Sequence, residues 1–479
     1  MKIVLILLFS AFFTFRAYNQ TIYQEREVEK TAVPQGGFHY LQQFIKDNLQ
    51  LPFQARVQQV QGRVFISGVV ETDGSVSNLK IVKGIHPLCD AEALRVIGLY
   101  QAWQPALNAN NAVRQVFNFS IVFPDTPITN YDSTSQSLVD YFTDKFQFTQ
   151  DPTVYHFRRS IPVDKNGVIR DNVVIEELKK KQWNPFSSAT FRKDPLMYKM
   201  NEEGVVDSLP AYRITARDES WNSYVPEIIF QEKNDQLLST TDYQGFTVVG
   251  YSHYYKSGLL KERLMVDGNN QRIISWYDNG QIAEVIEREP FMPTQPTKER
   301  IVALWSREGK QHIKDGNGWA VKGKSIVSRG LVQNGYKTGR WIAKLADSTL
   351  FTDEIYEAGV LKTGTIYDKG EARTYTEIEK NPEFKGGLSG LAMFLTQNIK
   401  YPAQASRNNI SGKVYLTFVV CEDGSLCDYE ILKGIGWGCD EEALRVVKAM
   451  SGKWNPGLQY GKKVRVKYNM PVNFVLDRK

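Results

Sequence analysis

A segment of seventeen residues occurs twice in this chain of 479 residues. It reads IVKGIHPLCDAEALRVI at residues 81–97 and ILKGIGWGCDEEALRVV at residues 431–447, so that Cys439 follows Cys89 by 350 positions. The same offset, with a one-residue slip before the tryptophans, relates further pairs: Gly36-Gly37 and Gly386-Gly387, Phe44 and Phe394, Pro52 and Pro402, Gly62 and Gly412, Asp73-Gly74-Ser75 and Asp423-Gly424-Ser425, Trp103 and Trp454, Pro105 and Pro456. A register held over roughly 90 residues indicates an internal repeat. We therefore expect residues 34–125 and 380–479 to be two copies of one domain.

The pattern within the second copy predicts its secondary structure. An apolar stripe of helical spacing runs through residues 386–399 and stops before Pro402, since the residue before a proline avoids the α region. Alternation at residues 412–420, an Asp423-Gly424 turn and the following residues predict a hairpin. A second helix follows, with Asp440 as its expected N-cap, and then a last strand. The order helix, strand, strand, helix, strand predicts an α+β fold, with two helices on a three-stranded antiparallel sheet.

One constellation in the second copy resembles a known family. Its members are Tyr401, Pro402, Gly412, Asp423, Gly424, Asp440, Trp454 and Pro456. This set is similar to the C-terminal domain of TonB, the energy transducer of Gram-negative envelopes, in the version common in Bacteroidota. The resemblance is weaker over the first copy, where Leu51 replaces the tyrosine and His86-Pro87 interrupt the turn. It implies a periplasmic, non-enzymatic domain that binds the TonB box, an extended peptide of outer-membrane receptors, by strand addition.

The last strand of the second copy is the expected peptide-binding site. An open sheet leaves unpaired backbone groups on its last strand, here residues 464–476. The candidate residues are Val464, Val466, Tyr468, Met470 and Val472. The basic residues nearby either meet an acidic peptide or form a solvated face. The tryptophans Trp103 and Trp454 are expected to cap the core rather than to bind a ligand.

The first twenty residues are typical of a secretory signal. Lys2 precedes an apolar run of about 13 residues, shorter than the roughly 20 that a membrane span needs. We expect a signal peptide at residues 1–19 and a periplasmic location, with an inner-membrane anchor as the alternative if the segment is not cleaved. A standard TonB also has a long proline-rich spacer, whereas the 19 prolines here are scattered. The peptide-binding mode is therefore better supported than the energy-transducing role.

The region between the copies divides into two expected parts. Residues 126–245 are expected to form an α/β linker region, in which residues 137–146 have a helical pattern and Asn166-Gly167 indicate a hairpin. Residues 246–370 repeat an aromatic residue, a few polar residues and a glycine. The glycines concerned are Gly258, Gly280, Gly309, Gly339 and Gly359. These units resemble MORN-type repeats, and we expect them to be stacked β-hairpins.

The composition gives little support to other functions. The formal charge of +6 comes without a basic, aromatic-rich run, so no nucleic-acid binding is expected. The five histidines have no metal-ligand spacing, and no nucleophile or nucleotide motif occurs, so we expect no metal, no cofactor and no enzyme activity. The cysteines Cys89 and Cys439 either are reactive helix-start thiols or, preferably, small packed residues. The cysteines Cys421 and Cys427 flank the Asp423-Gly424 turn, as a disulfide or as free thiols.

Two functions follow from these patterns. In the first, the protein binds outer-membrane TonB-dependent receptors or other envelope proteins through its TonB-like ends, with the last strand of the second copy as the best candidate, in TonB-dependent transport. In the second, the protein is a cell-envelope scaffold, in contact with peptidoglycan through the hairpin region and without energy transduction.

Overall fold

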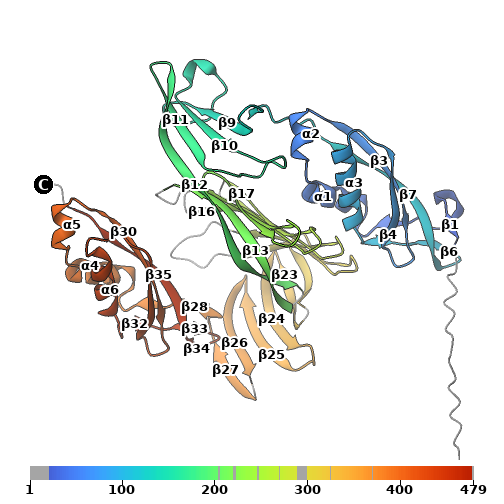
Figure 1. Cartoon of the computed structure of the whole chain (residues 1–479). Helices are drawn as coiled ribbons and strands as arrows, with labels where there is room; N and C mark the ends of the chain where they lie inside the picture. Colours follow the sequence, from blue (N-terminus) through green and yellow to red (C-terminus); the bar gives the residue numbers. More distant parts are fainter. Residues whose placement is uncertain are drawn as a thin grey trace, which may run out of the picture. The chain divides into compact units, whose positions relative to one another are not determined.

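The computed structural model describes residues 21–202, 205–218, 223–244, 247–268, 270–288, 299–323, 325–368 and 370–476. They form two compact units, one ending at Asn317 and one beginning at Gly318, and each is described by itself. The first unit contains the first copy of the repeat, and the second unit contains the second copy (Figure 1). The signal peptide expected at residues 1–19 lies outside the described residues. Within the described ranges, no helix has the length and apolar character that a membrane span requires.

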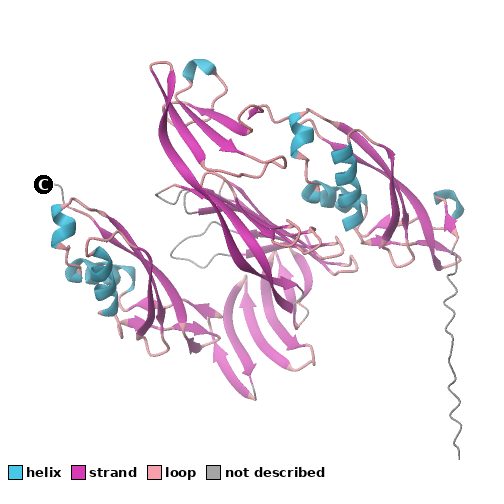
Figure 2. Cartoon of the chain, viewed as in Figure 1, coloured by secondary structure: helices cyan, strands magenta, loops and turns pink. Residues whose placement is uncertain are grey.

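The described residues are mostly strand, and the six α-helices lie in the two copies; the helical segment between the copies in Figure 2 is a short 3-10 turn at Pro152–Val154. In the second copy the predicted helices and strands are α4 (Gly387–Asn398), β30 (Gly412–Val420), β31 (Leu426–Lys433), α6 (Cys439–Lys448) and β35 (Val466–Phe474). The strands form a three-stranded antiparallel sheet in the order β31-β30-β35. Alternate residues of β30 are buried with Ala443 and Val447 of α6 in one core. The helix and hairpin predictions for this copy are therefore confirmed.

Shorter elements in the second copy were not predicted. They are β28 (Glu379–Lys380), β29 (Glu383–Phe384), α5 (Ala403–Arg407), β32 (Trp454–Asn455), β33 (Gly457–Gln459) and β34 (Lys462–Val464). The expected single strand at 464–476 is divided at Arg465, because β34 pairs with β33 whereas β35 pairs with β30. The last strand therefore begins two residues later than the alternation suggests.

The first copy repeats this order and adds strands. Its elements are β1 (Ile22–Tyr23), a 3-10 turn at Glu25–Glu27, β2 (Val33–Pro34), α1 (Phe38–Asn48), α2 (Phe53–Val57), β3 (Gly62–Val70), β4 (Val76–Lys83), α3 (Pro87–Leu99), β5 (Trp103–Gln104), β6 (Ala106–Asn108) and β7 (Asn111–Phe123). The sheet order is β1-β7-β3-β4, with β6 also paired to β7. The sheet has five strands rather than the predicted three, because β1 and β6 also pair with β7.

An aspartate explains the spacing of the repeated motif. It does so by bonding to the preceding turn and not by acting as the predicted N-cap. The N-cap of α6 is Gly438, in a left-handed conformation. The carboxylate of Asp440 instead folds back, and its Oδ1 accepts hydrogen bonds from the backbone N–H groups of Ile435 and Gly436 at 2.8 and 3.2 Å. Asp90 accepts the equivalent bond from Ile85 at 3.0 Å in the first copy. The N-cap prediction is therefore wrong, because the carboxylate satisfies the preceding turn and not the helix.

The region between the copies is a long run of strands. Consecutive strands from β8 to β21 in the first unit, and from β22 to β27 in the second, pair antiparallel wherever their register is resolved. Their bounds are β8 (Tyr131–Asp132), β9 (Ser137–Phe142), β10 (Phe157–Pro162), β11 (Val173–Lys179), β12 (Gln182–Glu202), β13 (Val205–Arg217), β14 (Glu227–Gln231), β15 (Leu237–Gln244), β16 (Thr247–Tyr254), β17 (Leu260–Asp267), β18 (Asn270–Trp276), β19 (Ile282–Arg288), β20 (Glu299–Trp305), β21 (Gln311–Lys314), β22 (Asn317–Lys322), β23 (Ile326–Gln333), β24 (Tyr336–Leu345), β25 (Leu350–Glu357), β26 (Val360–Asp368) and β27 (Glu371–Tyr375). A short 3-10 turn at Pro152–Val154 precedes β10.

The predictions for this region have different outcomes. The hairpin at Asn166-Gly167 is confirmed, since the N–H of Gly167 donates to the carbonyl of Asp164 between β10 and β11. The helix at 137–146 is wrong: residues 137–142 are strand β9, because pairing with β10 decides the structure of a short segment rich in β-forming residues. Gly258, Gly280, Gly309 and Gly359 lie at hairpin turns, whereas Gly339 lies inside β24. Strand β15 pairs with β16, so antiparallel pairing continues across the expected division between 126–245 and 246–370.

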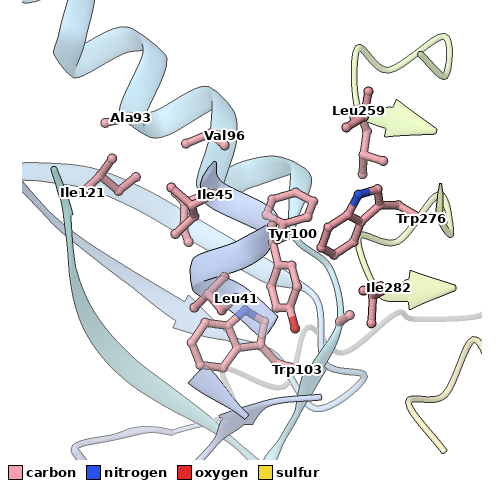
Figure 3. Close-up of a cluster of buried hydrophobic side chains, with 14 of the residues drawn as sticks. Leu41, Ile45, Ala93, Val96, Tyr100, Trp103, Ile121, Leu259, Trp276 and Ile282 are labelled. Atoms are coloured by element: carbon pink, nitrogen blue, oxygen red, sulfur yellow. The ribbon is translucent and has the colours of Figure 1, made fainter. Parts of the chain in front are cut away.

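The core of the first unit continues from the first copy into the hairpins. Leu41, Ile45 and Tyr100 of the first copy belong to the same buried cluster as Trp276 and Ile282 of the hairpin strands. Figure 3 shows the ring of Trp276 beside Tyr100, with Leu259 and Ile282 on the same side. The first copy is therefore packed on the hairpin turns as part of one folded unit.

Candidate peptide-binding edge

Strand β35 lies at one edge of the sheet in the second copy. It pairs along its whole length with β30, from Gly412 opposite Phe474 to Val420 opposite Val466. Among the described residues, no strand pairs with its other side. The backbone groups on that side are therefore available to an added strand.

A proline shows which residues of β35 direct their backbone groups outward. Pro471 lies opposite Tyr415 within the paired strand and has no N–H. In antiparallel sheets, residues alternate between bonding to the neighbour and facing away, and proline is tolerated at the outward positions of edge strands. The N–H of Cys421, at the end of β30, donates to the carbonyl of Ser425 on the β31 side. The backbone groups of the preceding residue, Val420, therefore point toward β35. Both observations assign the outward backbone groups to Lys467, Asn469, Pro471 and Asn473.

The five predicted binding residues lie on the other set of positions. Met470 and Val472 are buried in the core of the second copy, with exposed fractions of 4% and 0%. Val466 and Tyr468 are half-buried, and Tyr468 packs on Phe418 and Trp454. Val464 belongs to the separate strand β34. Their side chains hold the strand on the core, so an added peptide would meet backbone groups of the alternate residues.

The motif residues stabilise the fold of the domain around the sheet. The hydroxyl of Tyr401 donates to the carbonyl of Ile410, and its ring lies edge-on to Phe474. Gly424 has a positive φ of +81° and lies against the backbone carbonyl of Trp454, where a Cβ would collide. The carboxylate of Asp423 accepts from Ser425, which lowers the pKa of Asp423. Pro402 precedes α5, Gly412 begins β30, and Pro456 is half-buried between β32 and β33. These residues build the domain rather than a ligand contact.

A basic hollow lies at the start of the edge. It has a volume of about 370 Å³, and its wall includes Arg373 of β27, the β33–β34 turn and Arg465. The N–H at Nε of Arg373 donates to the carbonyl of Tyr460 at 3.1 Å, and the ring of Tyr460 packs on Tyr375. The lining carries four cations and two carboxylates: Arg373, Lys462, Lys463, Arg465, Asp368 and Glu422. The excess of cations favours an acidic side chain there. Sequence reasoning missed this hollow, because β27 lies far from the domain's own motifs.

The corresponding edge of the first copy is partly covered by the chain itself. Strand β7 is the equivalent of β35, with Arg114 matching Arg465. Strand β1 pairs with it in parallel, Ile22 opposite Arg114 and Tyr23 opposite Gln115. Further along, the N–H of Lys30 donates to the carbonyl of Leu107, so the segment is fixed at a second point. The first copy thus shows how an extended segment adds to this edge.

The cysteines differ in their surroundings. Cys89 and Cys439 are buried at the starts of α3 and α6, and burial raises the pKa of both thiols, as expected for packed residues. The Sγ atoms of Cys421 and Cys427 lie 2.8 Å apart as thiols. Cys427 lies opposite Val419, so the two cysteines are diagonal neighbours across the hairpin.

Both copies match one protein family. The family is described as Gram-negative bacterial TonB protein C-terminal, and its model matches residues 47–124 and 397–476. The two ends of the chain are TonB C-terminal domains, and the resemblance seen in their sequences is confirmed. This is a protein-interaction domain without catalytic activity, found in envelope-associated proteins that contact outer-membrane receptors or other envelope proteins. No curated protein matches the chain. The resemblance of the hairpins to MORN-type repeats stays a prediction.

Proposed function

We propose that this protein is exported to the periplasm and that its second TonB C-terminal domain binds extended peptides of outer-membrane receptors. The peptide would add to the outer side of β35, where Lys467 and Asn469 supply backbone donors and acceptors. The observation that supports this edge over β31, which is also terminal in the sheet, is the first copy: an extended segment there pairs with β7, the equivalent of β35.

The two copies would then have different roles. In the first copy β1 holds part of the edge, and the helices pack on the hairpins of the same unit. In the second copy the edge has no strand partner within the described residues. We infer that the second copy binds the receptor peptide and that the first copy is structural. The basic hollow next to Arg465 would favour peptides with an acidic residue near the end that lies there.

The experiment compares three proteins for recovery of receptors from envelope extracts. They are the unchanged chain, Asn469→Ala and Asn469→Pro. The two variants lose the same side chain, but only Asn469→Pro loses the outward N–H. We expect Asn469→Pro to reduce receptor recovery at least tenfold and Asn469→Ala to retain it. Equal recovery by both variants, with the fold intact, would contradict strand addition at β35.

A scaffold role is the second candidate, favoured by the packing of the first copy on the hairpin array. It predicts binding to isolated peptidoglycan that does not depend on Asn469. Deletion of residues 250–375 would expose the core of the first copy, so the hairpin turns are better tested by surface substitutions.

A further inference from the structure

The helix face that packs on the hairpins in the first copy has a counterpart in the second. In the first copy, Phe44 of α1 lies edge-on to Trp276 with ring centres 5.6 Å apart, and Tyr40 lies edge-on to Trp305 at 5.3 Å. Gly280, at the turn between β18 and β19, has a positive φ of +86° and allows the turn to approach Phe44 and Tyr100. The hairpins thus present tryptophans at strand ends and a glycine at the turn.

Backbone hydrogen bonds fix the position of the hairpins on this face. The N–H of Leu260 donates to Oδ1 of Asn48 at 2.7 Å. The N–H of Gln101 donates to the carbonyl of Asn279 at 2.8 Å. The contact therefore combines aromatic packing with polar contacts that recognise strand backbone, as a specific interface does.

The second copy keeps the key residues of this face. Phe394 and Asn398 match Phe44 and Asn48, and both asparagines donate from Nδ2 to the carbonyl four residues earlier, at 3.0 and 2.8 Å. Gly390 matches Tyr40, so the ring that meets Trp305 is missing. A hollow of about 490 Å³ lies there, lined in part by Met393 and Phe394. Leu388 and Met393 of α4 are 76% and 62% exposed.

We propose that the α4 face of the second copy binds β-hairpin turns of another protein. The partner's hairpin would carry an aromatic residue at a strand end and a glycine in the turn, as the hairpins on the first copy do. The aromatic ring fills the hollow over Gly390, and a strand N–H bonds to Asn398. Lys385 and Lys453, which border the hollow, favour an acidic residue in the turn. The turns at Gly280 and Gly309 are excluded as occupants in the same chain, because the first copy covers them.

The test uses the full chain and a synthetic hairpin of residues 270–288, which carries Trp276, Asp278 and Gly280. We expect saturable binding of the labelled hairpin, weakened at least tenfold by Met393→Asp and unchanged by Leu432→Ser, an exposed apolar residue on β31. A hairpin with Gly280→Val should not bind. Absent binding, or equal binding by the Met393→Asp and Leu432→Ser proteins, would overturn the proposal. Self-association of the chain that Met393→Asp abolishes would overturn it in favour of a second copy as the occupant.

A second inference concerns the hairpin next to the peptide-binding edge. The Sγ atoms of Cys421 and Cys427 lie 2.8 Å apart and are half-exposed, and Nη2 of Arg465 donates to Sγ of Cys427 at 3.3 Å. The hydrogen bond with Cys421 and burial raise the pKa of the Cys427 thiol, and the guanidinium of Arg465 opposes this shift. The short distance between the two sulfurs, rather than an acidic thiol, favours closure once the thiolate, the form that attacks a disulfide, is present. The same Arg465 separates β34 from β35.

The geometry points to a Cys421–Cys427 disulfide that forms after export, and the proposal rests on the proposed periplasmic location. The Cys427 thiolate attacks one sulfur of an oxidising disulfide and releases the other as a thiolate. Cys421, losing its proton to solvent, then attacks the Cys427 sulfur and releases the second thiolate. Two protein thiols are oxidised to one disulfide, and the oxidant is reduced to two thiols.

Mass spectrometry tests this inference directly, because no lysine or arginine lies between residues 414 and 432. The reduced full chain is treated with oxidised glutathione, the free thiols are alkylated, and the protein is digested with trypsin. We expect the peptide 414–433 to escape alkylation and to lose the mass of two hydrogens, while peptides with Cys89 and Cys439 are alkylated after unfolding. Alkylation of Cys421 and Cys427, or a mixed disulfide with glutathione that persists, would overturn the inference. Its failure would leave receptor binding at β35 untouched.

Discussion

The carboxylate of Asp440 occupies the space that any side chain at Gly434 would need, and Asp90 and Gly84 have the same relationship in the first copy. A Cβ at either glycine would collide with the aspartate oxygens. The two parts of the repeated segment are therefore required together. They are the lysine-glycine-isoleucine turn and the cysteine-aspartate pair that begins the helix. The repeated segment identifies the domain, and its conserved spacing within the chain reflects this contact rather than catalysis.

Removal of the Asp440 carboxylate should destabilise the second unit. Asp440→Ala leaves the N–H groups of Ile435 and Gly436 without their acceptor, and a hydrogen bond to a charged group contributes about 1.5–3 kcal/mol. We expect the free energy of unfolding of this unit to fall by about 3 kcal/mol, measured by urea denaturation. Asp423→Ala, which loses only local bonds in an exposed turn, is the matched control. A loss no larger than in that control would show that the contact is dispensable.

The turn at Gly280 should be sensitive to any side chain. A Cβ at Gly280 would lie 3.0 Å from ring atoms of Phe44 and Tyr100, whereas a Cβ at Gly268 would meet no described atom within 4 Å, although the φ of Gly268 is also positive. The variants Gly280→Val and Gly268→Val both carry backbone strain, and the difference between them isolates the collision. We expect Gly280→Val to be less stable than Gly268→Val by about 2 kcal/mol and to raise hydrogen exchange in α1. Similar exchange in the two variants would contradict docking of α1 on this turn.

Acid should weaken the second copy through Glu442. The side chain of Arg445 donates to this carboxylate at 2.7 Å and the N–H of Lys400 at 2.6 Å, and the pKa of Glu442 is lowered, chiefly by Arg445. A lowered pKa in the folded state gives stability that is present above the unfolded pKa of about 4.3 and is lost as pH falls through the folded value. Glu442→Gln should therefore show a shallower fall in urea midpoint between pH 6 and pH 3 than Glu441→Gln, an exposed neighbour. Parallel curves would contradict this role.

Much of the repeated domain follows from its sequence, because apolar periodicity and turn residues are local signals. The helix α4, the hairpin β30–β31 and the helix α6 are predicted for this reason. The Asp440 contact is not, since an aspartate at a helix start is ordinarily an N-cap and only the fold brings Gly434 to its carboxylate. In the segment 137–142 a local pattern misleads, because pairing with β10 makes it a strand despite its helical pattern.

In the candidate site, too, local patterns predict some features and contacts between distant segments determine the others. The alternation of apolar and polar residues along 464–474 identifies the strand. It also led to the choice of the inward residues as binding residues, because apolar side chains mark the core face. The outward positions Lys467 and Asn469 are recognisable from Pro471 only once its neighbour β30 is known. Strand β1 and the hollow beside Tyr460 depend on segments distant in sequence, which no local pattern in the domain predicts.

Release of the first copy's edge should create a second binding site. Deletion of residues 21–24 removes β1 but leaves the anchoring contact of Lys30 with Leu107. With a receptor peptide that binds the unchanged chain, calorimetry should show a stoichiometry rising from one to two. A matched substitution, Glu25→Ala, keeps β1 and should leave it at one. A stoichiometry of one after the deletion would show that occupation by β1 does not distinguish the copies.

The most direct test of strand addition is amide exchange on β35 with and without that receptor peptide. The N–H groups of Lys467 and Asn469 face outward, whereas those of Val466 and Tyr468 face β30. We predict that the peptide slows exchange at Lys467 and Asn469 at least tenfold and leaves Val466 and Tyr468 unchanged. Protection on β31, with Lys467 and Asn469 still exchanging as in the free protein, would contradict the account.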